Sequence, residues 1–437
     1  MVHQELREER EGGTGMIVFL VGFVILLVIG VPISISIGAS AVLGCLSLGY
    51  PMVVIGQKMV SGIDSFLLIA IPLFIFAGNL MNAGSITKKI FNTARELVGW
   101  IPGGLGHANV IASVIFAGMA GSAVADAGGL GAIEMEAMKS NGYDEDFAGA
   151  VTAASSVIGP IFPPSIPLII YGSVASVSVS KLFMGGVVPA VMMALLLMAM
   201  VYYFAVRRHY ERHPFSGKAL WHEFKGSILA LITPLIILSG FTVGWFTPTE
   251  ASSIAVIYAL IISVLVYRTM TWKQFLKCLK DSALSSANTL FIIGSSTLFT
   301  YVMAMEGYSN KIANFILGIS THQAVILLIL NIILLLLGMV MEPGAILTLM
   351  LPVLLPIAKK LGLDLVHFGV MLVLNLMIGQ VTPPFGVCLF VISDVNKIKL
   401  EKLYKAILPW CIPLVLTLLM VTYLPHIVTW LPNALLK

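Results

Sequence analysis

Residues 157–167 read VIGPIFPPSIP and residues 377–387 read MIGQVTPPFGV, and both stretches lie inside long apolar segments. A proline lacks the backbone N–H that a helix needs, and its ring clashes with the preceding turn, so two consecutive prolines stop a helix. The backbone groups left without helical partners are tolerated at membrane depth only where they are buried in protein or line a polar cavity. The pattern therefore predicts two broken helices whose breaks serve a common function.

The composition places these helices in a membrane. The 437-residue chain is 58% hydrophobic and 11% charged, with a mean hydropathy of +1.00, and many segments reach the ~20 apolar residues that cross a bilayer. We expect an all-α protein that spans the membrane many times. The apolar run from Met16 lacks a small-residue cleavage site, and we interpret it as a retained span. The four cysteines lie singly in apolar segments, which predicts neither disulfides nor a zinc site.

An internal duplication relates the two proline breaks. At an offset of 220 residues, segment 118–164 aligns with segment 338–384 without gaps. The identities are Gly118/Gly338, Met119/Met339, Ala125/Ala345, Lys139/Lys359, Gly142/Gly362, Asp144/Asp364, Gly149/Gly369, Ile158/Ile378, Gly159/Gly379, Pro163/Pro383 and Pro164/Pro384. Broken helices at matching places in inverted repeats are typical of the midplane binding site of a secondary transporter.

The duplication predicts how the chain is organised. A polar tail, 1–15, precedes a first repeat, 16–206, and a linker, 207–226, leads to a second repeat, 227–437. In the first repeat we expect scaffold spans in 16–83, an amphipathic arm helix at 86–99, a re-entrant hairpin at 104–139, a broken helix at 144–173 and a span at 182–206. In the second we expect scaffold spans in 227–306 (with an amphipathic segment 271–281 separate from a span 283–306), an arm helix at 309–320, a hairpin at 322–360, a broken helix at 364–393 and a last span at 406–432.

Charge predicts the orientation of these segments. If each hairpin enters and leaves on one side, each repeat crosses the membrane five times, and the second repeat is inverted relative to the first. Placing the linker 207–226 in the cytoplasm puts most of the 25 basic residues inside, as the positive-inside rule requires, although Lys359 and Lys360 fall outside. Both chain termini are then predicted to be periplasmic.

Polar residues at the hairpin turns and at the breaks are the candidates for a binding site. Asp126 and Glu342 would be intramembrane carboxylates, which are functional candidates by default. For each of them, capping the half-helix that follows is an equally good interpretation, and the two roles are compatible. The candidate substrate-binding residues are Ser122, Asp126, Thr152, Ser155, Ser156, Ser165, Asn375 and Thr382.

The residues at the turns and breaks also bear on the charge of the transported molecule. No Lys or Arg lies in a hairpin turn or a proline break, so an anion there would be met by half-helix N-termini, hydroxyl groups and co-bound cations. Backbone carbonyls at the breaks suit a hard cation bound through oxygen, and Na⁺ is the natural candidate.

Several stretches carry a resemblance to a known family. They are IPLFIFAGNLMNAG (71–84), GMAGSAVADAGGLGAIEMEAMK (118–139), AASSVIGPIFPPSIPLIIYG (153–172), FTPTEAS (246–252), LMLPVLLPIAKKLG (349–362) and NLMIGQVTPPFGVCLFV (375–391). Together they resemble the large membrane subunit, or M subunit, of tripartite ATP-independent periplasmic (TRAP) transporters. The resemblance covers essentially the whole chain after residue 15.

The resemblance implies an elevator-type, sodium-driven importer in the bacterial inner membrane. Its substrate would be an organic anion, such as a sialic acid or a C4-dicarboxylate. Its partners would be a small membrane subunit, the Q subunit, and a soluble periplasmic binding protein, the P subunit, which delivers the substrate. Spans 16–49 and 227–267 would offer the face for the small subunit. No organic cofactor and no nucleic acid are implied.

The resemblance also implies two sodium sites. One joins the turn around Ser122 to the break at 159–165, and the other joins the turn at 342–344 to the break at 379–384. The sodium ligands, partly through backbone carbonyls, would be Ser122, Gly159, Pro163, Pro164, Glu342, Pro343, Gly344, Gly379, Thr382 and Pro383.

Other classes of protein are weaker interpretations. A sodium/carboxylate symporter that needs no binding protein would share the same repeats and breaks. A channel would explain polar breaks, but not two facing hairpins of opposite orientation. An intramembrane enzyme would need a nucleophile with a base or a metal cluster, and the sequence contains neither HExxH nor GxSxG.

Overall fold

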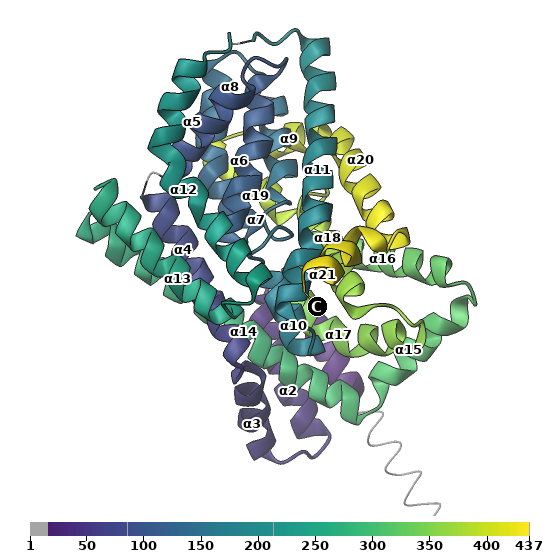
Figure 1. The fold of residues 1–437 in the computed structure, drawn as a ribbon. Helices are drawn as coiled ribbons and strands as arrows, with labels where there is room; N and C mark the ends of the chain where they lie inside the picture. The colour runs from purple at the N-terminus through teal and green to yellow at the C-terminus, as the bar shows by residue number, and fades with distance from the viewer. Residues whose placement is uncertain (1–15, 85, 213, 437) are drawn as a thin grey trace, which may run out of the picture.

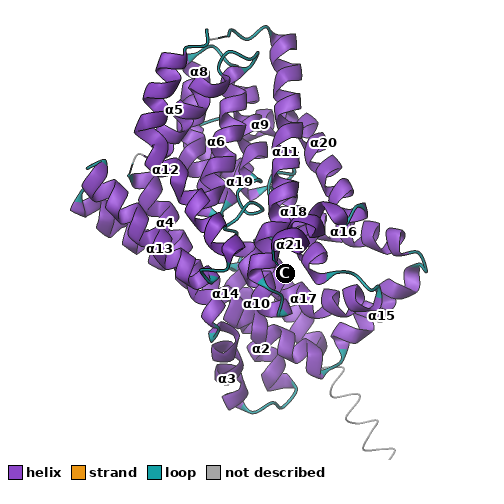
Figure 2. Cartoon of the chain, in the orientation of Figure 1, coloured by secondary structure: helices purple, strands orange, loops and turns teal. Residues whose placement is uncertain are grey.

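The fold is helical throughout the part of the chain that the computed structural model describes, residues 16–84, 86–212 and 214–436 (Figure 1). Within these ranges no strand occurs, and short loops join the helices (Figure 2). The all-α class predicted from the sequence is confirmed. The predicted polar tail, 1–15, lies outside the described residues.

The helices follow the two halves of the chain. After a helix at Met16–Val28, the first half contains α2 (Ile33–Ser47), α3 (Met52–Ile63), α4 (Ala70–Ala83), α5 (Ile86–Val98), α6 (Gly104–Ala120), α7 (Ala123–Ala125), α8 (Gly131–Ser140), α9 (Glu145–Ser156), α10 (Ile166–Ala175) and α11 (Val179–Arg208). The second half contains α12 (Gly217–Val243), α13 (Pro248–Leu260), α14 (Trp272–Met305), α15 (Tyr308–Ile319), α16 (Gln323–Val340), α17 (Pro343–Lys360), α18 (Leu365–Gly379), α19 (Val387–Asn396), α20 (Leu400–Tyr423) and α21 (His426–Leu435).

Many of these helices have the length and composition of membrane spans. Among the described residues, eight helical stretches are long and apolar enough: Phe66–Ala83, Val179–Arg208, Gly217–Phe241, Pro248–Val266, Trp272–Met305, Gln323–Val340, Pro343–Lys360 and Leu400–Tyr423. Their apolar outer faces have no other element of the described chain to pack against, which is the arrangement that a lipid solvent allows. The expectation of a multi-spanning membrane protein is confirmed.

Both proline pairs interrupt helices. In the first half, α9 ends at Ser156 and α10 begins at Ile166, with Ser165 as its N-cap. In the second half, α18 ends at Gly379 and α19 begins at Val387. The first break is buried within the protein, and the second is partly exposed at its prolines. Irregular backbone at this depth is therefore shielded largely by neighbouring helices, as the cost of unpaired amides requires.

The first hairpin turns at one glycine. Helix α6 ends at Ala120, its C-cap residue Gly121 has a φ of 59° in the left-handed region, and Ser122 then caps the short helix α7. The returning arm contains a π-helical segment, Asp126–Leu130, before α8 begins at Gly131. A π-helix is rare and is often found at functional sites, and nothing in the sequence predicted this one.

The second hairpin and the first break lie together. Helix α16 ends at Val340, and α17 begins at Pro343 with Glu342 as its N-cap. Helix α17 packs against α10, the half-helix that follows the first break, while α9 packs against α20 of the other half. The two halves of the chain are therefore interlocked, and each hairpin reaches the same central region (Figure 1).

Three boundaries differ from the sequence-based expectation. The predicted linker 207–226 is helical from Gly217, because Ser216 caps α12 and nothing in 217–226 breaks a helix. The predicted last span, 406–432, begins earlier, at Leu400, and is divided at Pro425 into α20 and α21. Proline has no N–H to continue α20, so the chain turns there.

The separation expected between 271–281 and 283–306 is wrong. Helix α14 runs without interruption over 34 residues, so it is about 50 Å long at 1.5 Å per residue. Its counterpart in the first half is broken, because Asp64 leaves the helical region and Ser65 adopts extended backbone between α3 and the next helical turn. The two scaffolds are therefore less symmetric than the hairpins, and α14 packs along α2, α3, α4 and α17.

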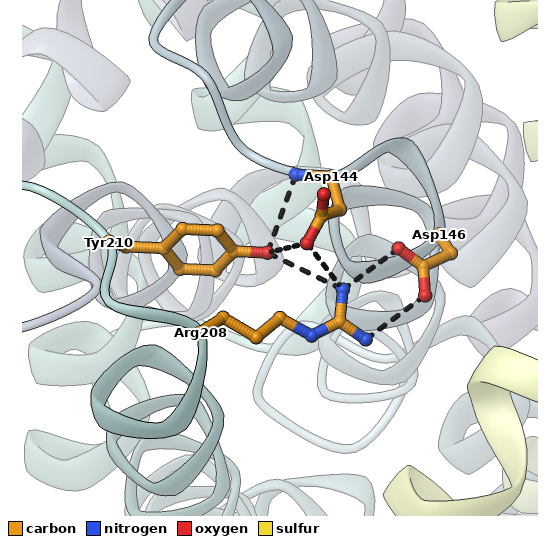
Figure 3. A network of polar contacts seen from close by, with 4 residues as sticks. All are labelled: Asp144, Asp146, Arg208 and Tyr210. Carbon is orange, nitrogen blue, oxygen red and sulfur yellow. Dashed lines mark hydrogen bonds and ion pairs between the residues drawn. The ribbon is translucent and has the colours of Figure 1, made fainter.

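An ion-pair network fixes the start of α9 to the end of α11 (Figure 3). The Arg208 guanidinium donates to both carboxylate oxygens of Asp146, at 2.9 and 3.0 Å, and to Asp144 Oδ2 at 2.8 Å. The Tyr210 hydroxyl donates to the same Asp144 oxygen at 2.9 Å. The network holds the connection between the first hairpin and the first broken helix against α11.

Candidate functional site

A cavity of about 340 Å³ lies where both hairpin tips, both breaks and two scaffold helices meet. Its lining residues are Ile75, Gly78, Asn79, Ala120, Gly121, Ser122, Ala123, Val124, Ala125, Pro160, Ile166, Pro167, Ser285, Thr289, Glu342, Pro343, Met377 and Gln380. This volume is at the lower end of the ~300–1,000 Å³ range of small-molecule sites. The cavity is therefore large enough for one small organic molecule.

The first hairpin tip touches the first break. A Cβ atom built on Gly121 would lie 2.5 Å from the Pro164 carbonyl oxygen, and one on Gly159 would lie 3.6 Å from the Ser122 carbonyl oxygen. Only glycine allows such an approach at Gly121, where φ is also positive. The structure thus brings together the two segments proposed for the first sodium site.

The second hairpin tip has a similar relation to the second break. A Cβ atom on Gly379 would lie 2.5 Å from the Gly338 carbonyl carbon, so α18 ends in direct backbone contact with α16. Glu342 accepts a hydrogen bond from the Ala345 amide at 3.2 Å and faces the cavity beside Pro343. Glu342 therefore combines the two roles left open by the sequence, a helix cap and a carboxylate at the site.

The cavity has a distinct electrostatic character. No Lys or Arg is among its lining residues, and Glu342 is its one ionisable lining side chain. The first residues of α10, Ile166 and Pro167, and the first residue of α17, Pro343, line it. Two helix N-termini thus border the cavity. Ser165 and Glu342 cap the Leu168 and Ala345 amides, and the positive dipole ends of the two helices favour a bound anion.

Most other predicted site residues lie away from the cavity lining. Ser165 donates to the Pro160 carbonyl and accepts from the Leu168 amide, so it holds the first break together. Asn375 donates to Asn331, and Thr382 donates to the Ile378 carbonyl at 2.6 Å. The remaining ones outside the lining are Asp126, Thr152, Ser155, Ser156, Gly159, Pro163, Pro164, Gly344, Gly379 and Pro383.

Among the residues outside the lining, the polar side chains nearest the first hairpin lie in the interior of the first half. Thr152 and Ser155 form hydrogen bonds with Asn109 of α6, in the interior of the first half. Asp126 is 2% exposed and does not line the cavity that the residues before it line. The structure places these residues behind the hairpin tip and not at the cavity surface.

Four polar lining residues were not among the sequence candidates: Asn79, Ser285, Thr289 and Gln380. Asn79 of α4 donates to Ser282 of α14 at 2.8 Å, so the scaffold side of the cavity is a polar seam between two helices. Ser285 and Thr289 are four residues apart and share one face of α14. A polar residue in an apolar span was the available signal, since such positions face protein or water in preference to lipid.

Known proteins share the sequence and the fold of this chain. The family model described as tripartite ATP-independent periplasmic transporter, DctM component, matches residues 20–427. The chain is 43% identical over 381 residues to the sialic acid TRAP transporter large permease protein SiaM of Vibrio cholerae, covering 87% of this chain and 89% of that protein. It is 41% identical over 428 residues to the sialic acid TRAP transporter permease protein SiaT of Haemophilus influenzae, covering 97% and 69%.

A solved structure supports the fold independently of sequence. The YdaH transporter of Alcanivorax borkumensis, described as having an unusual topology, superposes with a TM-score of 0.65 over 85% of this chain and 88% of that chain. The sequence identity is 12%, so the likeness concerns the fold alone.

Proposed function

Because the chain belongs to the DctM component family of tripartite ATP-independent periplasmic transporters, we propose that it imports an organic carboxylate by sodium-coupled, elevator-type transport. It acts as the large permease subunit and receives its substrate from a periplasmic binding protein. The observation that carries the proposal is the central cavity, which both hairpin tips and both proline breaks reach. A transporter, not an enzyme, is the class to which its relatives' names assign it.

The lining of the cavity supports a hydroxylated carboxylate as substrate. Two helix N-termini favour the carboxylate, and they supply positive potential that no lining side chain provides. The Asn79, Ser122, Ser285, Thr289 and Gln380 side chains offer several hydrogen-bond partners for hydroxyl and amide groups. A sialic acid has many such groups and one carboxylate, whereas a C4-dicarboxylate has two charges and fewer hydroxyls, so we favour a sialic acid.

Sodium is the coupling ion in this proposal. The two tips and breaks offer hydroxyl, carboxylate and backbone carbonyl oxygens, with Ser122 and Glu342 at the cavity surface. Oxygen ligands suit a hard cation such as Na⁺. A sodium ion bound beside the cavity would supply the positive charge that no lining side chain offers to the anion.

The remaining parts of the proposal concern the membrane and the partners. The loop between α11 and α12 is cytoplasmic, the two termini are periplasmic, and the chain lies in the bacterial inner membrane. The small membrane subunit docks on the scaffold helices Met16–Val28 and α13, where apolar side chains such as Val28 and Ile257 are exposed. Helices α5 and α15 brace the moving part against this scaffold.

Uptake into liposomes tests the proposal. The chain and its small membrane subunit are reconstituted together, and entry of labelled sialic acid is measured with and without an inward sodium gradient and the purified binding protein. We expect uptake only when both are present. Sodium-driven uptake without the binding protein would instead identify an independent symporter, and uptake that ignores the gradient would refute sodium coupling.

The scaffold side of the cavity can be tested with neighbouring serines. Replacing Ser285 with alanine removes a hydrogen-bonding group from the lining, and a loss of about 1 kcal/mol corresponds to a roughly fivefold decrease in kcat/KM for uptake. Ser286 is the matched control, because it is buried, donates to the Ser282 carbonyl at 2.7 Å and does not line the cavity. Equal effects of the two substitutions would remove Ser285 from the site.

A further inference from the structure

A group of polar side chains lies behind the first hairpin tip, outside the substrate cavity. It consists of Asn109 and Ser113 of α6, Asp126 of the π-helical segment, Glu134 of α8, and Thr152 and Ser155 of α9, and we call it the buried carboxylate cluster. All six side chains except those of Asp126, at 2%, and Thr152, at 1%, are 0% exposed. A cluster this deep has to satisfy its charges internally.

The spacing of these residues explains why they meet. Asn109 and Ser113 are four residues apart on α6, and Thr152 and Ser155 are three apart on α9, so each pair shares one helix face. Helices α6, α8 and α9 pack against one another, and the π-helical segment packs against α6 and α9. Three polar faces therefore converge in the interior of the first half.

A chain of hydrogen bonds leads from Glu134 through Asn109 and Ser155 to Ser113. The Asn109 amide donates to Glu134 Oε2 at 2.6 Å and to Thr152 Oγ1 at 2.8 Å, while the Ser155 hydroxyl donates to Asn109 Oδ1 at 2.7 Å. The Ser113 hydroxyl donates to the Ser155 hydroxyl at 3.1 Å and lies close to the Asp126 carboxylate. The polar groups are organised and not merely buried.

Two oxygens of this cluster remain without a partner. Asp126 Oδ2 and Glu134 Oε1 are fully buried and accept no hydrogen bond from the described residues. Among those residues, neither carboxylate forms an ion pair with a Lys, Arg or His. A cation bound between neutral oxygen donors would give both oxygens a partner and offset the cost of burying the two carboxylates.

We propose that the buried carboxylate cluster binds a sodium ion through Asp126 and Glu134, with the Thr152 and Ser113 hydroxyls as neutral oxygen donors. The oxygen-only donor set suits a hard cation, and its carboxylates supply charge that backbone carbonyls at the tips lack. This site is separate from the tip-and-break segments, and its role in coupling rests on the proposed function.

The position of Asp126 links this ion to the substrate cavity. Residues 122–125 line the cavity, and Asp126 follows them directly as the first residue of the π-helical segment. A sodium ion held by Asp126 and Glu134 connects the start of this segment to α8, eight residues later. Filling the site thereby holds the hairpin tip in its cavity-lining arrangement, so that sodium and the organic anion bind cooperatively.

Equilibrium binding of ²²Na⁺ to the purified full chain, without organic anion or binding protein, tests the site. Relative to the wild-type chain, Glu134→Gln and Asp126→Asn should each bind one sodium ion fewer per chain, or bind it at least tenfold more weakly. Glu134→Asp keeps the charge on a shorter arm and should retain the stoichiometry with weaker affinity. Glu136→Gln is the matched control, because Glu136 is exposed on the same helix, and it should bind as the wild type does.

The outcomes separate this site from the transport proposal. If folded Glu134→Gln and Asp126→Asn proteins, checked by circular dichroism and gel filtration, bind as many sodium ions within about twofold of the wild-type affinity, the site is refuted even where wild-type uptake is sodium-driven. If these variants change only the pH dependence of uptake, the cluster binds a proton and the proposal is wrong. Loss of one sodium ion per chain supports the site even if no carboxylate tested is transported.

Discussion

Replacing Gly121 with alanine is expected to reduce sodium-driven uptake at least 100-fold while the protein still inserts and folds. A Cβ atom at this position would lie 2.5 Å from the Pro164 carbonyl oxygen, so the first hairpin tip and the first break would be forced apart. The left-handed φ of 59° adds about 1–2 kcal/mol for a residue with a Cβ. Because both segments border the cavity, a small displacement there misplaces the groups that bind substrate and sodium.

Gly142 provides the control for this experiment. Its φ of 78° is also left-handed, but a Cβ atom there would have nothing within 4 Å. The Gly142→Ala protein should therefore suffer the backbone cost without the collision, and its uptake should remain within about threefold of the wild type. Uptake by Gly121→Ala equal to that by Gly142→Ala would show that the contact between tip and break is not needed for transport.

Substitutions at Glu342 should separate its two roles. Glu342→Ala removes the hydrogen bond to the Ala345 amide, a cap worth about 1 kcal/mol, and also the one carboxylate of the cavity lining. We expect uptake to fall at least 30-fold. Glu342→Gln keeps a cap oxygen and the side-chain shape while removing the charge, and we expect the sodium concentration for half-maximal uptake to rise about tenfold.

Asp364 is the matched control for this pair. It caps α18 through hydrogen bonds from the Val366 and His367 amides, at 2.8 and 3.0 Å, and it does not line the cavity. Asp364→Asn retains a good capping residue, so sodium dependence should not change. If Glu342→Gln likewise leaves the half-maximal sodium concentration unaltered, the Glu342 charge takes no part in cation binding.

Local sequence rules predicted the parts of the fold that depend on local geometry. Two Pro-Pro pairs end α9 and α18 because proline cannot continue a helix, and Pro343 marks the second hairpin turn for the same reason. The predicted separation between 271–281 and 283–306 was wrong, because amphipathic character was interpreted as a separate element, and the polar linker is shorter than predicted, because α12 begins at Gly217. A helix continues until a backbone signal stops it, whatever face it presents.

The candidate site was predicted only in part. Ser122, Glu342 and Pro343 were singled out because they sit at hairpin turns, and they line the cavity. Asp126 was singled out by the same reasoning, yet it faces the interior, because the π-helical segment and its packing determine its direction. Intramembrane polarity identifies residues that avoid lipid, but it does not distinguish a cavity from a buried cluster.

By itself the sequence determined the membrane class, the duplicated hairpins and the two breaks, because apolar length and proline chemistry act within a few residues of the chain. Only the tertiary structure decided which side chains share a site. Asn79 and Ser282 are 203 residues apart and form a hydrogen bond, and Asn109 joins Glu134 to Thr152 across three helices. Such contacts depend on how whole helices pack, and the free energy that selects the packing comes from many residues at once.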